Sequence, residues 1–133
     1  MTKTIQQSVT LPASARTLYR LFTDPKLHAA FTGSPSVAIS SKPGAKFSAF
    51  NHMIWGSTLH SVPGQLLIQR WRSAHFKTSD LDSILILQFT DLSKNRARID
   101  LAHVNVPPQD HTGVANGWKK YYWQPVRRYL AQR

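Results

Sequence analysis

The C-terminal part of the chain carries an aromatic face that requires burial. If residues 114–130 form a helix at about 100° per residue, seven apolar or aromatic side chains fall within an arc of roughly 140°. This stripe consists of Val114, Trp118, Tyr121, Tyr122, Pro125, Val126 and Tyr129. An amphipathic helix with so wide a stripe is stable only against another element, so the rest of the chain must provide a surface to cover it.

The opposite side of this helix is polar and basic. Lys120, Arg127 and Arg128 lie there, and the same helical spacing places Trp123 among them, about 140° from the centre of the stripe. Pro125 interrupts the helix because it removes one backbone hydrogen bond, and we expect a kink that makes the aromatic face convex. A convex face of this kind fits a concave sheet.

The residues before this helix predict such a sheet. Residues 5–12 alternate apolar and polar side chains, as in a half-buried strand, and helical spacing with capping residues predicts two short helices at 14–22 and 25–31. Pro-Gly turn signals at 42–45 and 62–65 then separate short β segments. We expect these segments to form further strands, near 36–41, 46–51, 54–61, 66–73, 83–90 and 96–105.

The order of the elements predicts an α+β protein. Two short helices follow strand one, and a curved antiparallel sheet of six to seven strands wraps around the long C-terminal helix, which is the layout of a helix-grip fold. The segment "SILILQF" at 83–89 is apolar on both sides, so we expect it in the middle of the sheet. No repeat or linker interrupts the chain, and its length suits one core, so we expect a single domain over residues 1–133.

Three segments of the chain resemble a known family. They are "VTLPASARTLYRLFTDPKLHAAFTGSP" at 9–35, "KPGAKFSAFNHMIWGSTLHSVPGQLLIQRWRS" at 42–73 and "LAHVNVPPQDHTGVANGWKKYYWQPVRRYL" at 101–130. Together they resemble the START-like (SRPBCC) superfamily and, more narrowly, the C-terminal domain of the activator of the ninety-kilodalton heat-shock protein ATPase. The chain departs from the family pattern where Asn51 and His52 replace the common Asp-Gly of a turn.

The resemblance implies more about fold than about function. START-like relatives often enclose an apolar cavity between sheet and helix that holds lipids or aromatic metabolites, and some use it for catalysis. The eukaryotic activator carries a separate N-terminal domain on which chaperone stimulation largely depends, and 133 residues leave no room for it. Fold-level similarity does not choose among these functions.

Charge and composition limit the partners. The chain has 17 Lys and Arg against 6 Asp and no Glu, which gives a net charge of +11 and favours an acidic partner. Nucleic-acid binding is disfavoured, because most aromatic side chains that could stack on bases belong to the stripe that the fold buries. The chain has no cysteine, no apolar leader at its start and no run near the ~18 apolar residues of a membrane span, so we expect a cytoplasmic protein.

No pattern of catalytic, cofactor-binding or metal-binding residues is found. The chain lacks a nucleophile elbow, a P-loop, a dinucleotide-binding glycine pattern and an H-E-x-x-H motif, and its six histidines do not pair at helical spacing. Asp80 and Asp82 are spaced like a carboxylate pair, but they fall in a polar segment beside Lys77 that is typical of a solvated turn. We therefore predict no catalytic residue, no metal and no cofactor.

A cavity between sheet and helix would be lined from both sides. On the strand near 96–105, alternation places three side chains on the face that meets the helix, and His103 is the polar one. We expect a tyrosine hydroxyl to satisfy His103, with ligand contact or proton transfer as the alternative. The cavity candidates from the two elements are Ile99, Leu101, His103, Trp118, Tyr122, Val126 and Tyr129.

Two further features concern the basic surface. Trp71 is expected to be buried, with Arg70 and Arg72 pointing outward from its strand, and anion binding by this pair is the alternative. The outer face of the C-terminal helix is the candidate surface for a partner, through Lys119, Lys120, Trp123, Arg127 and Arg128.

The sequence therefore favours binding over catalysis. The first hypothesis is a domain that holds a hydrophobic or lipid-like small molecule between the sheet and the C-terminal helix. The alternative is a protein-binding accessory factor, of the co-chaperone or stress-response type, that meets an acidic protein with its basic surface.

Overall fold

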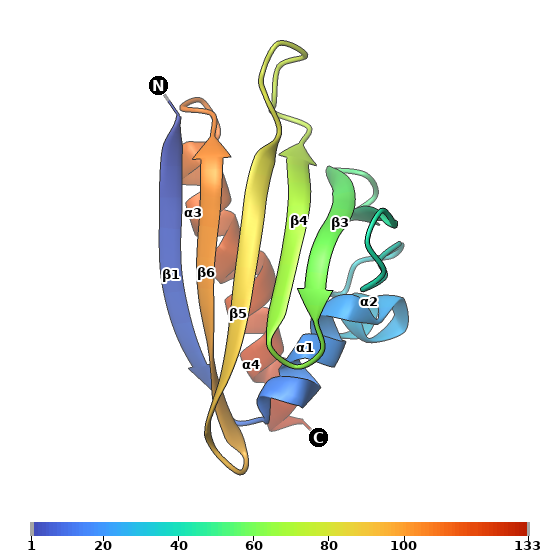
Figure 1. Cartoon of the computed structure of the whole chain (residues 1–133), viewed down its shortest axis with the longest axis vertical. Coiled ribbons are helices and arrows are strands. Elements are labelled where there is room, and N and C mark those ends of the chain that lie inside the picture. The colour runs from blue at the N-terminus through green and yellow to red at the C-terminus, as the bar shows by residue number, and fades with distance from the viewer. Residues whose placement is uncertain (1, 133) are drawn as a thin grey trace.

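A six-stranded antiparallel sheet forms one layer of the protein, in the order β1-β6-β5-β4-β3-β2. The computed structural model describes residues 2–132. The strands are β1 (Lys3–Leu11), β2 (Lys46–Ala49), β3 (Ile54–Val62), β4 (Leu66–Ser73), β5 (Ser83–Ser93) and β6 (Arg96–Val106). Figure 1 shows β1, β6, β5, β4 and β3 side by side, and the short β2 pairs with β3 to form the second edge of the sheet.

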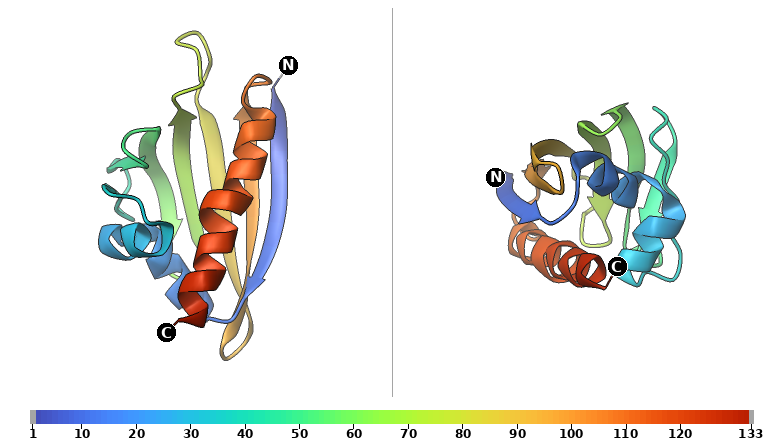
Figure 2. Two further views of the ribbon diagram at one scale, coloured as in Figure 1. Left: turned by 180° about the vertical axis from the view of Figure 1, so that it is seen from behind. Right: turned by 90° about the horizontal axis from the view of Figure 1, so that it is seen from below.

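Two short helices follow β1, as the capping residues predict. Ser14 caps α1 (Ala15–Thr23) by accepting a hydrogen bond from the backbone N–H of Thr17. Asp24 then caps α2 (Pro25–Thr32) through the N–H groups of the first turn, and α2 ends at Gly33, whose φ of 74° is the left-handed conformation that glycine adopts freely. Both helices lie on the same side of the sheet as the C-terminal helix (Figure 2).

The C-terminal helix runs along one face of the sheet as a continuous rod (Figure 2). It consists of α3 (His111–Trp118), a π-helical turn η1 (Lys119–Trp123) and α4 (Gln124–Ala131). In the π-helical turn, the backbone N–H of Gln124 bonds to the carbonyl of Lys119, five residues back. This turn ends two residues before Pro125, which lies in the first turn of α4, where a proline is well tolerated.

The π-helical turn corrects the helical spacing that the sequence predicted. A wider turn changes the angular position of every residue that follows, relative to an ideal α-helix. Trp123, expected on the outer face, is buried at 6% exposure, whereas Tyr121, expected in the buried stripe, is 47% exposed. Leu130 joins the buried side as well.

The predicted strand at 36–41 is absent from the part of the chain that the structure describes. Only one isolated bridge, between Ala38 and Ser48, pairs this segment with β2. The carbonyls of Ser40 and Ser41 instead accept hydrogen bonds from the side chains of Thr58 and Ser61, at 2.6 and 2.7 Å. Side-chain bonds thus replace a strand ladder, and the sheet has six strands, the lower of the two numbers expected.

The core lies between the concave sheet face and the helices. β5 is an interior strand, as predicted, because it pairs with β4 on one side and β6 on the other. Leu85, Leu87 and Phe89 point from it into the core and are at most 4% exposed. Ile84 and Ile86 alternate with them on the outer face, where they are only partly buried because the helices cover one face of the sheet.

Candidate functional site

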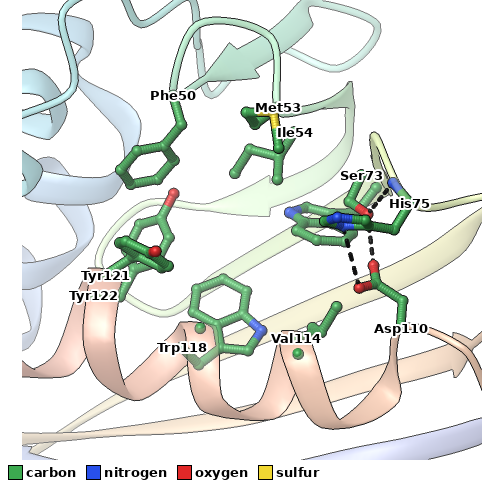
Figure 3. A pocket seen from close by; sticks show the side chains of 13 residues that line it. Phe50, Met53, Ile54, Ser73, His75, Asp110, Val114, Trp118, Tyr121 and Tyr122 are labelled. Atoms are coloured by element: carbon green, nitrogen blue, oxygen red, sulfur yellow. Dashed lines mark hydrogen bonds and ion pairs between the residues drawn. The ribbon is translucent and has the colours of Figure 1, made fainter.

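A pocket of about 420 Å³ lies between the C-terminal helix and the β2–β3 end of the sheet. Its walls come from the β2–β3 turn, the end of β4, and successive turns of α3 and η1 (Figure 3). Most of its surface is apolar, and five aromatic side chains contribute to it. These are Phe50, Trp71, Trp118, Tyr121 and Tyr122.

The β2–β3 turn holds one wall of the pocket in an unusual backbone conformation. Phe50, Asn51 and His52 have φ angles of 53°, 57° and 65°, so three successive residues other than glycine are left-handed. The turn places the Phe50 ring 5.6 Å from that of Tyr121 and 5.8 Å from that of Tyr122, measured between centroids. Asn51 and His52 are the residues that replace Asp-Gly in the family pattern, and the chain forms the turn without the glycine.

His103 lies behind the pocket in a fully satisfied network. The indole N–H of Trp118 donates to Nδ1 of His103 at 3.2 Å, so Nδ1 is an acceptor and the proton is on Nε2. Nε2 is 2.9 Å from the hydroxyl of Ser83, whose own hydrogen goes to the carbonyl of Trp71. Burial lowers the pKa of His103 to about 3, so the ring is neutral at physiological pH. A serine and a tryptophan therefore bond His103, in place of the expected tyrosine.

Sequence reasoning missed a second buried histidine, His28 of α2. Its Nδ1 lies 3.1 Å from the carbonyl of Phe22, and its Nε2 lies 3.0 Å from the hydroxyl of Tyr122. Burial lowers the pKa of His28 to about 4, partly opposed by the Phe22 carbonyl, and burial also raises the pKa of Tyr122. The available signal was the spacing of His28 and Phe31, which puts both on one helix face.

The polar end of the pocket is built around Asp110, just before α3. Its Oδ2 accepts a hydrogen bond of 2.5 Å from the hydroxyl of Ser73, and its Oδ1 lies 3.5 Å from Nδ1 of His75. Asp110 is 6% exposed, although it carries a charge and its side chain does not cap the helix. The pocket therefore combines aromatic walls with a carboxylate at one end.

Comparison with known proteins places this architecture in a family. Residues 12–131 match the family model described as "Activator of Hsp90 ATPase homolog 1-like protein". The chain belongs to this family. It is 26% identical over 120 residues to the activator of 90 kDa heat shock protein ATPase homolog 1 of Mus musculus, covering 90% of this chain and 34% of that protein. The chain thus spans about a third of the length of the curated relatives that it matches.

Solved structures show the same helix-grip fold. An HSP90 activator from Plasmodium falciparum superimposes with a TM-score of 0.89 at 18% identity, with 96% of each chain covered. The solution structure of the Aha1 dimer from Colwellia psychrerythraea gives a TM-score of 0.77 at 12% identity, with 94% of this chain and 93% of that chain covered. At these identities the similarity concerns the fold alone.

In this member of the family, the pocket is displaced from the cavity that the sequence predicted. Of the seven candidates, only Trp118 and Tyr122 line it. The middle of the sheet–helix interface is filled by the others. Ile99, Leu101, His103 and Val126 are at most 3% exposed, and Tyr129 is partly buried against the core.

Four of the five candidates for a partner surface are exposed, and one is buried. Lys119, Lys120, Arg127 and Arg128 are exposed on the outer side of the C-terminal helix. Trp123 is a correction, because its buried indole N–H donates to Oε1 of Gln7 on β1 at 2.7 Å. The sequence could not show this, since the π-helical turn that rotates Trp123 inward depends on packing against the sheet.

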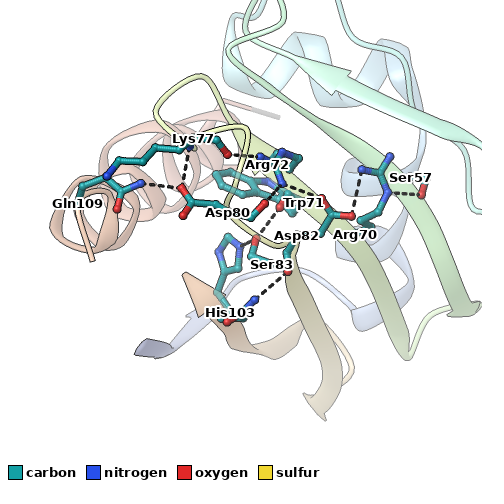
Figure 4. Close-up of polar contacts among 11 residues, drawn as sticks. Ser57, Arg70, Trp71, Arg72, Lys77, Asp80, Asp82, Ser83, His103 and Gln109 are labelled. Atoms are coloured by element: carbon teal, nitrogen blue, oxygen red, sulfur yellow. Dashed lines mark hydrogen bonds and ion pairs between the residues drawn. The ribbon is translucent and has the colours of Figure 1, made fainter. Parts of the chain in front are cut away.

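The two arginines beside Trp71 belong to a polar network with Asp82 and the loop before β5 (Figure 4). Trp71 is buried at 4% exposure, as predicted. Arg70 and Arg72 both pair with the carboxylate of Asp82, at 3.5 and 3.0 Å. Arg72 also donates to the carbonyls of Lys77 and Asp80, so it clamps the loop before β5. These partners occupy the guanidinium groups, which argues against anion binding there.

Residues 2–132 contain neither a cluster of metal-ligating side chains nor a helix suited to span a membrane. No group of three or more His, Cys, Asp or Glu side chains within this range is placed to hold a metal ion. No helix in the same range is both long and apolar enough to cross a membrane.

Proposed function

We propose that this chain binds an apolar small molecule in the pocket between the β2–β3 turn and the C-terminal helix. The observation that carries the proposal is the pocket itself, with its volume of about 420 Å³ and its aromatic lining. Sites for small molecules in proteins are mostly apolar clefts of roughly 300–1,000 Å³ with a few polar groups that orient the ligand. The pocket has these properties.

The polar groups of the pocket are not arranged as a serine nucleophile with its base, which is consistent with binding without catalysis. A serine nucleophile needs a base that accepts its proton, usually a histidine that is held by a carboxylate. Here the carboxylate of Asp110 lies between Ser73 and His75, so the Ser73 hydroxyl donates to Asp110. This order leaves Ser73 without a histidine base.

A neutral apolar dye tests the proposal. N-phenyl-1-naphthylamine should bind with a saturable increase in fluorescence and a single site. Gly117 lines the pocket, and a Cβ added there meets only Cδ2 of Tyr121 at 3.7 Å, an ordinary contact. Gly117→Leu should therefore fill the pocket and abolish dye binding, whereas the matched variant Gly117→Ala should keep it. Absence of saturable binding, or equal binding by the two variants, would contradict the proposal.

A second candidate function is supported by the basic row on the C-terminal helix. Lys119, Lys120, Arg127 and Arg128 are exposed, and none of the four forms an ion pair within residues 2–132. Such a row suits an acidic protein surface, where complementary charge speeds association. The relatives are named for activation of the Hsp90 ATPase, so a ninety-kilodalton heat-shock protein is the first partner to examine.

Charge reversal tests this second candidate. Replacing all four basic residues with glutamate should weaken binding to the chaperone about tenfold or more, and raised salt should weaken the parent's binding. The control replaces four exposed basic residues elsewhere on the surface with glutamate, so that the net charge changes by the same amount: Lys42, Lys46, Lys94 and Arg96. Equal losses in the two variants would mean that net charge matters and the helix row does not. A cytoplasmic location and a role in stress response stay predictions.

A further inference from the structure

Among the residues of the range 2–132 that line the pocket, Asp110 is the one acidic side chain, and there is no lysine or arginine. We propose that the pocket selects organic cations, holding an ammonium group at Asp110 and the attached apolar body against the aromatic walls. This inference rests on the proposed function, because it names the ligand class of the same pocket. It opposes what net charge alone suggests, since a chain of +11 attracts anions to its surface.

The bonding of Asp110 is the first argument. A carboxylate can accept about four hydrogen bonds, and a buried one is costly when few of them are formed. Oδ2 accepts one from Ser73, while Oδ1 accepts none from residues 2–132, and Nδ1 of His75 at 3.5 Å is the group paired with it. A Cβ on Gly113, which also lines the pocket, would lie 3.3 Å from Oδ1. Oδ1 is thus the acceptor that an ammonium group can use.

The direction of the carboxylate supports the same assignment. Figure 3 shows Asp110 reaching from the start of α3 towards Ser73 and His75, at the end of the pocket opposite Tyr121 and Tyr122. The side chain of Asp110 is 8% exposed, whereas that of His75 is 67% exposed. The negative charge therefore lies inside the pocket, where low solvent exposure strengthens its interaction with a bound cation.

The aromatic walls favour the same ligand class. The faces of aromatic rings attract cations through their quadrupole, and the apolar body of a ligand packs against the same rings. The rings of Trp118 and Tyr122 lie next to each other with centroids 4.6 Å apart. The ring of Phe50, from the β2–β3 turn, packs against that of Tyr121 with centroids 5.6 Å apart. An anionic head group would meet the Asp110 carboxylate without any cation in the lining to offset the repulsion.

A matched ligand series tests the proposal on the intact chain. The probes are 4-phenylbutylamine, 4-phenylbutanol and 4-phenylbutyrate, which share one apolar body and differ in head group. Isothermal titration calorimetry at pH 8, where an ordinary histidine is neutral, measures the three affinities. We expect the amine to bind about tenfold more tightly than the alcohol, and the carboxylate to bind more weakly than the alcohol.

Asp110→Asn identifies the residue responsible. It should lower amine affinity to that of the alcohol, about tenfold, while alcohol binding changes less than about threefold. The control Asp100→Asn changes a carboxylate that bonds to Ser8 and Arg98, away from the pocket lining, and should keep the amine preference.

The outcomes separate this inference from the proposed function. If the alcohol binds but the carboxylate binds as well as the amine, the selectivity for cations is refuted and the pocket remains a ligand site. An amine preference that survives in Asp110→Asn also refutes it. If none of the three probes binds, both the ligand class and the proposed function are contradicted. Should Asp110→Asn fail to fold, the amine-to-carboxylate ratio of the parent still decides.

Discussion

Acidification should destabilise this protein through its two buried histidines. His28 and His103 each have both ring nitrogens bonded in the neutral form, and burial lowers their pKa values to about 4 and about 3. In the unfolded chain an ordinary histidine has a pKa near 6.5. Because the folded values are lower, the stabilisation is complete well above pH 6.5 and is lost as the pH falls.

The size of the effect follows from proton linkage. Between pH 6.5 and the folded pKa, only the unfolded chain takes up the proton, and each pH unit costs about 1.4 kcal/mol per histidine. At pH 5 each histidine therefore removes about 2 kcal/mol, and the two together about 4 kcal/mol. This is a large part of the roughly 5–15 kcal/mol that stabilises an ordinary domain.

The composition of the chain limits how much its carboxylates add to the change in stability in this pH range. The chain contains no glutamate and only six aspartates, and an ordinary aspartate titrates near pH 4. Fewer carboxylates than in an ordinary domain can therefore add to the change between pH 7.5 and 5.

Urea unfolding followed by tryptophan fluorescence at pH 7.5, 6.0 and 5.0 measures the loss. The variants His28→Gln and His103→Gln keep a donor and an acceptor but cannot be protonated, so each should lose about 2 kcal/mol less than the parent between pH 7.5 and 5. His60→Gln, on the exposed part of β3, controls for the removal of a histidine as such. The reasoning is refuted if the parent is equally stable at pH 7.5 and 5, or if both variants lose as much as the parent.

Three other predictions concern the backbone and the helix, and urea unfolding measures each. His52→Gly should stabilise the protein by about 0.5–1 kcal/mol, because glycine adopts the left-handed conformation without steric cost; unchanged or lower stability would contradict the strain at the turn. Trp123→Ala should cost roughly 3–5 kcal/mol and Tyr121→Ala far less, whereas an ideal α-helix would reverse this order. Gly56→Ala should prevent stable folding or cost more than about 3 kcal/mol, because the added Cβ overlaps the carbonyl oxygen of Arg70; a mild effect would mean that β3 and β4 can separate there.

Local patterns were sufficient to predict the elements that depend on near neighbours. The caps of α1 and α2 formed at Ser14 and Asp24 because a short polar side chain before a helix bonds to backbone N–H groups two or three residues away. The interior position of β5 followed from its apolar residues on both faces. The single-domain prediction for residues 1–133 stays a prediction.

Residues 36–41 show where local patterns fail. Their position before the turn signal at 42–45 fits a strand, but a strand also needs a neighbour to pair with along its length. Here the side chains of Thr58 and Ser61 bond to the carbonyls of Ser40 and Ser41. That competition involves residues about twenty positions away, so no local window contains it.

The candidate site was predictable only in outline. The sequence indicated that Trp118 and Tyr122 face the sheet, and both line the pocket. It did not locate the polar end at Asp110, because Ser73 lies 37 residues away from it in the sequence and the two meet only in the folded chain. The contact of His28 was missed for the same reason, since its partner Tyr122 lies 94 residues later in the sequence.

By itself, the sequence determined the helix-grip layout and the burial of an aromatic helix face, because hydrophobic periodicity and turn residues act over short distances along the chain. Tertiary structure decided which aromatic side chains are buried and where a pocket remains. The π-helical turn before Pro125 rotates Trp123 into the core, where it bonds to Gln7, and leaves Tyr121 exposed. A π-helical turn is less favourable than an α-helical one, so it forms where contacts with the sheet stabilise it. Those contacts exist only once the chain has folded.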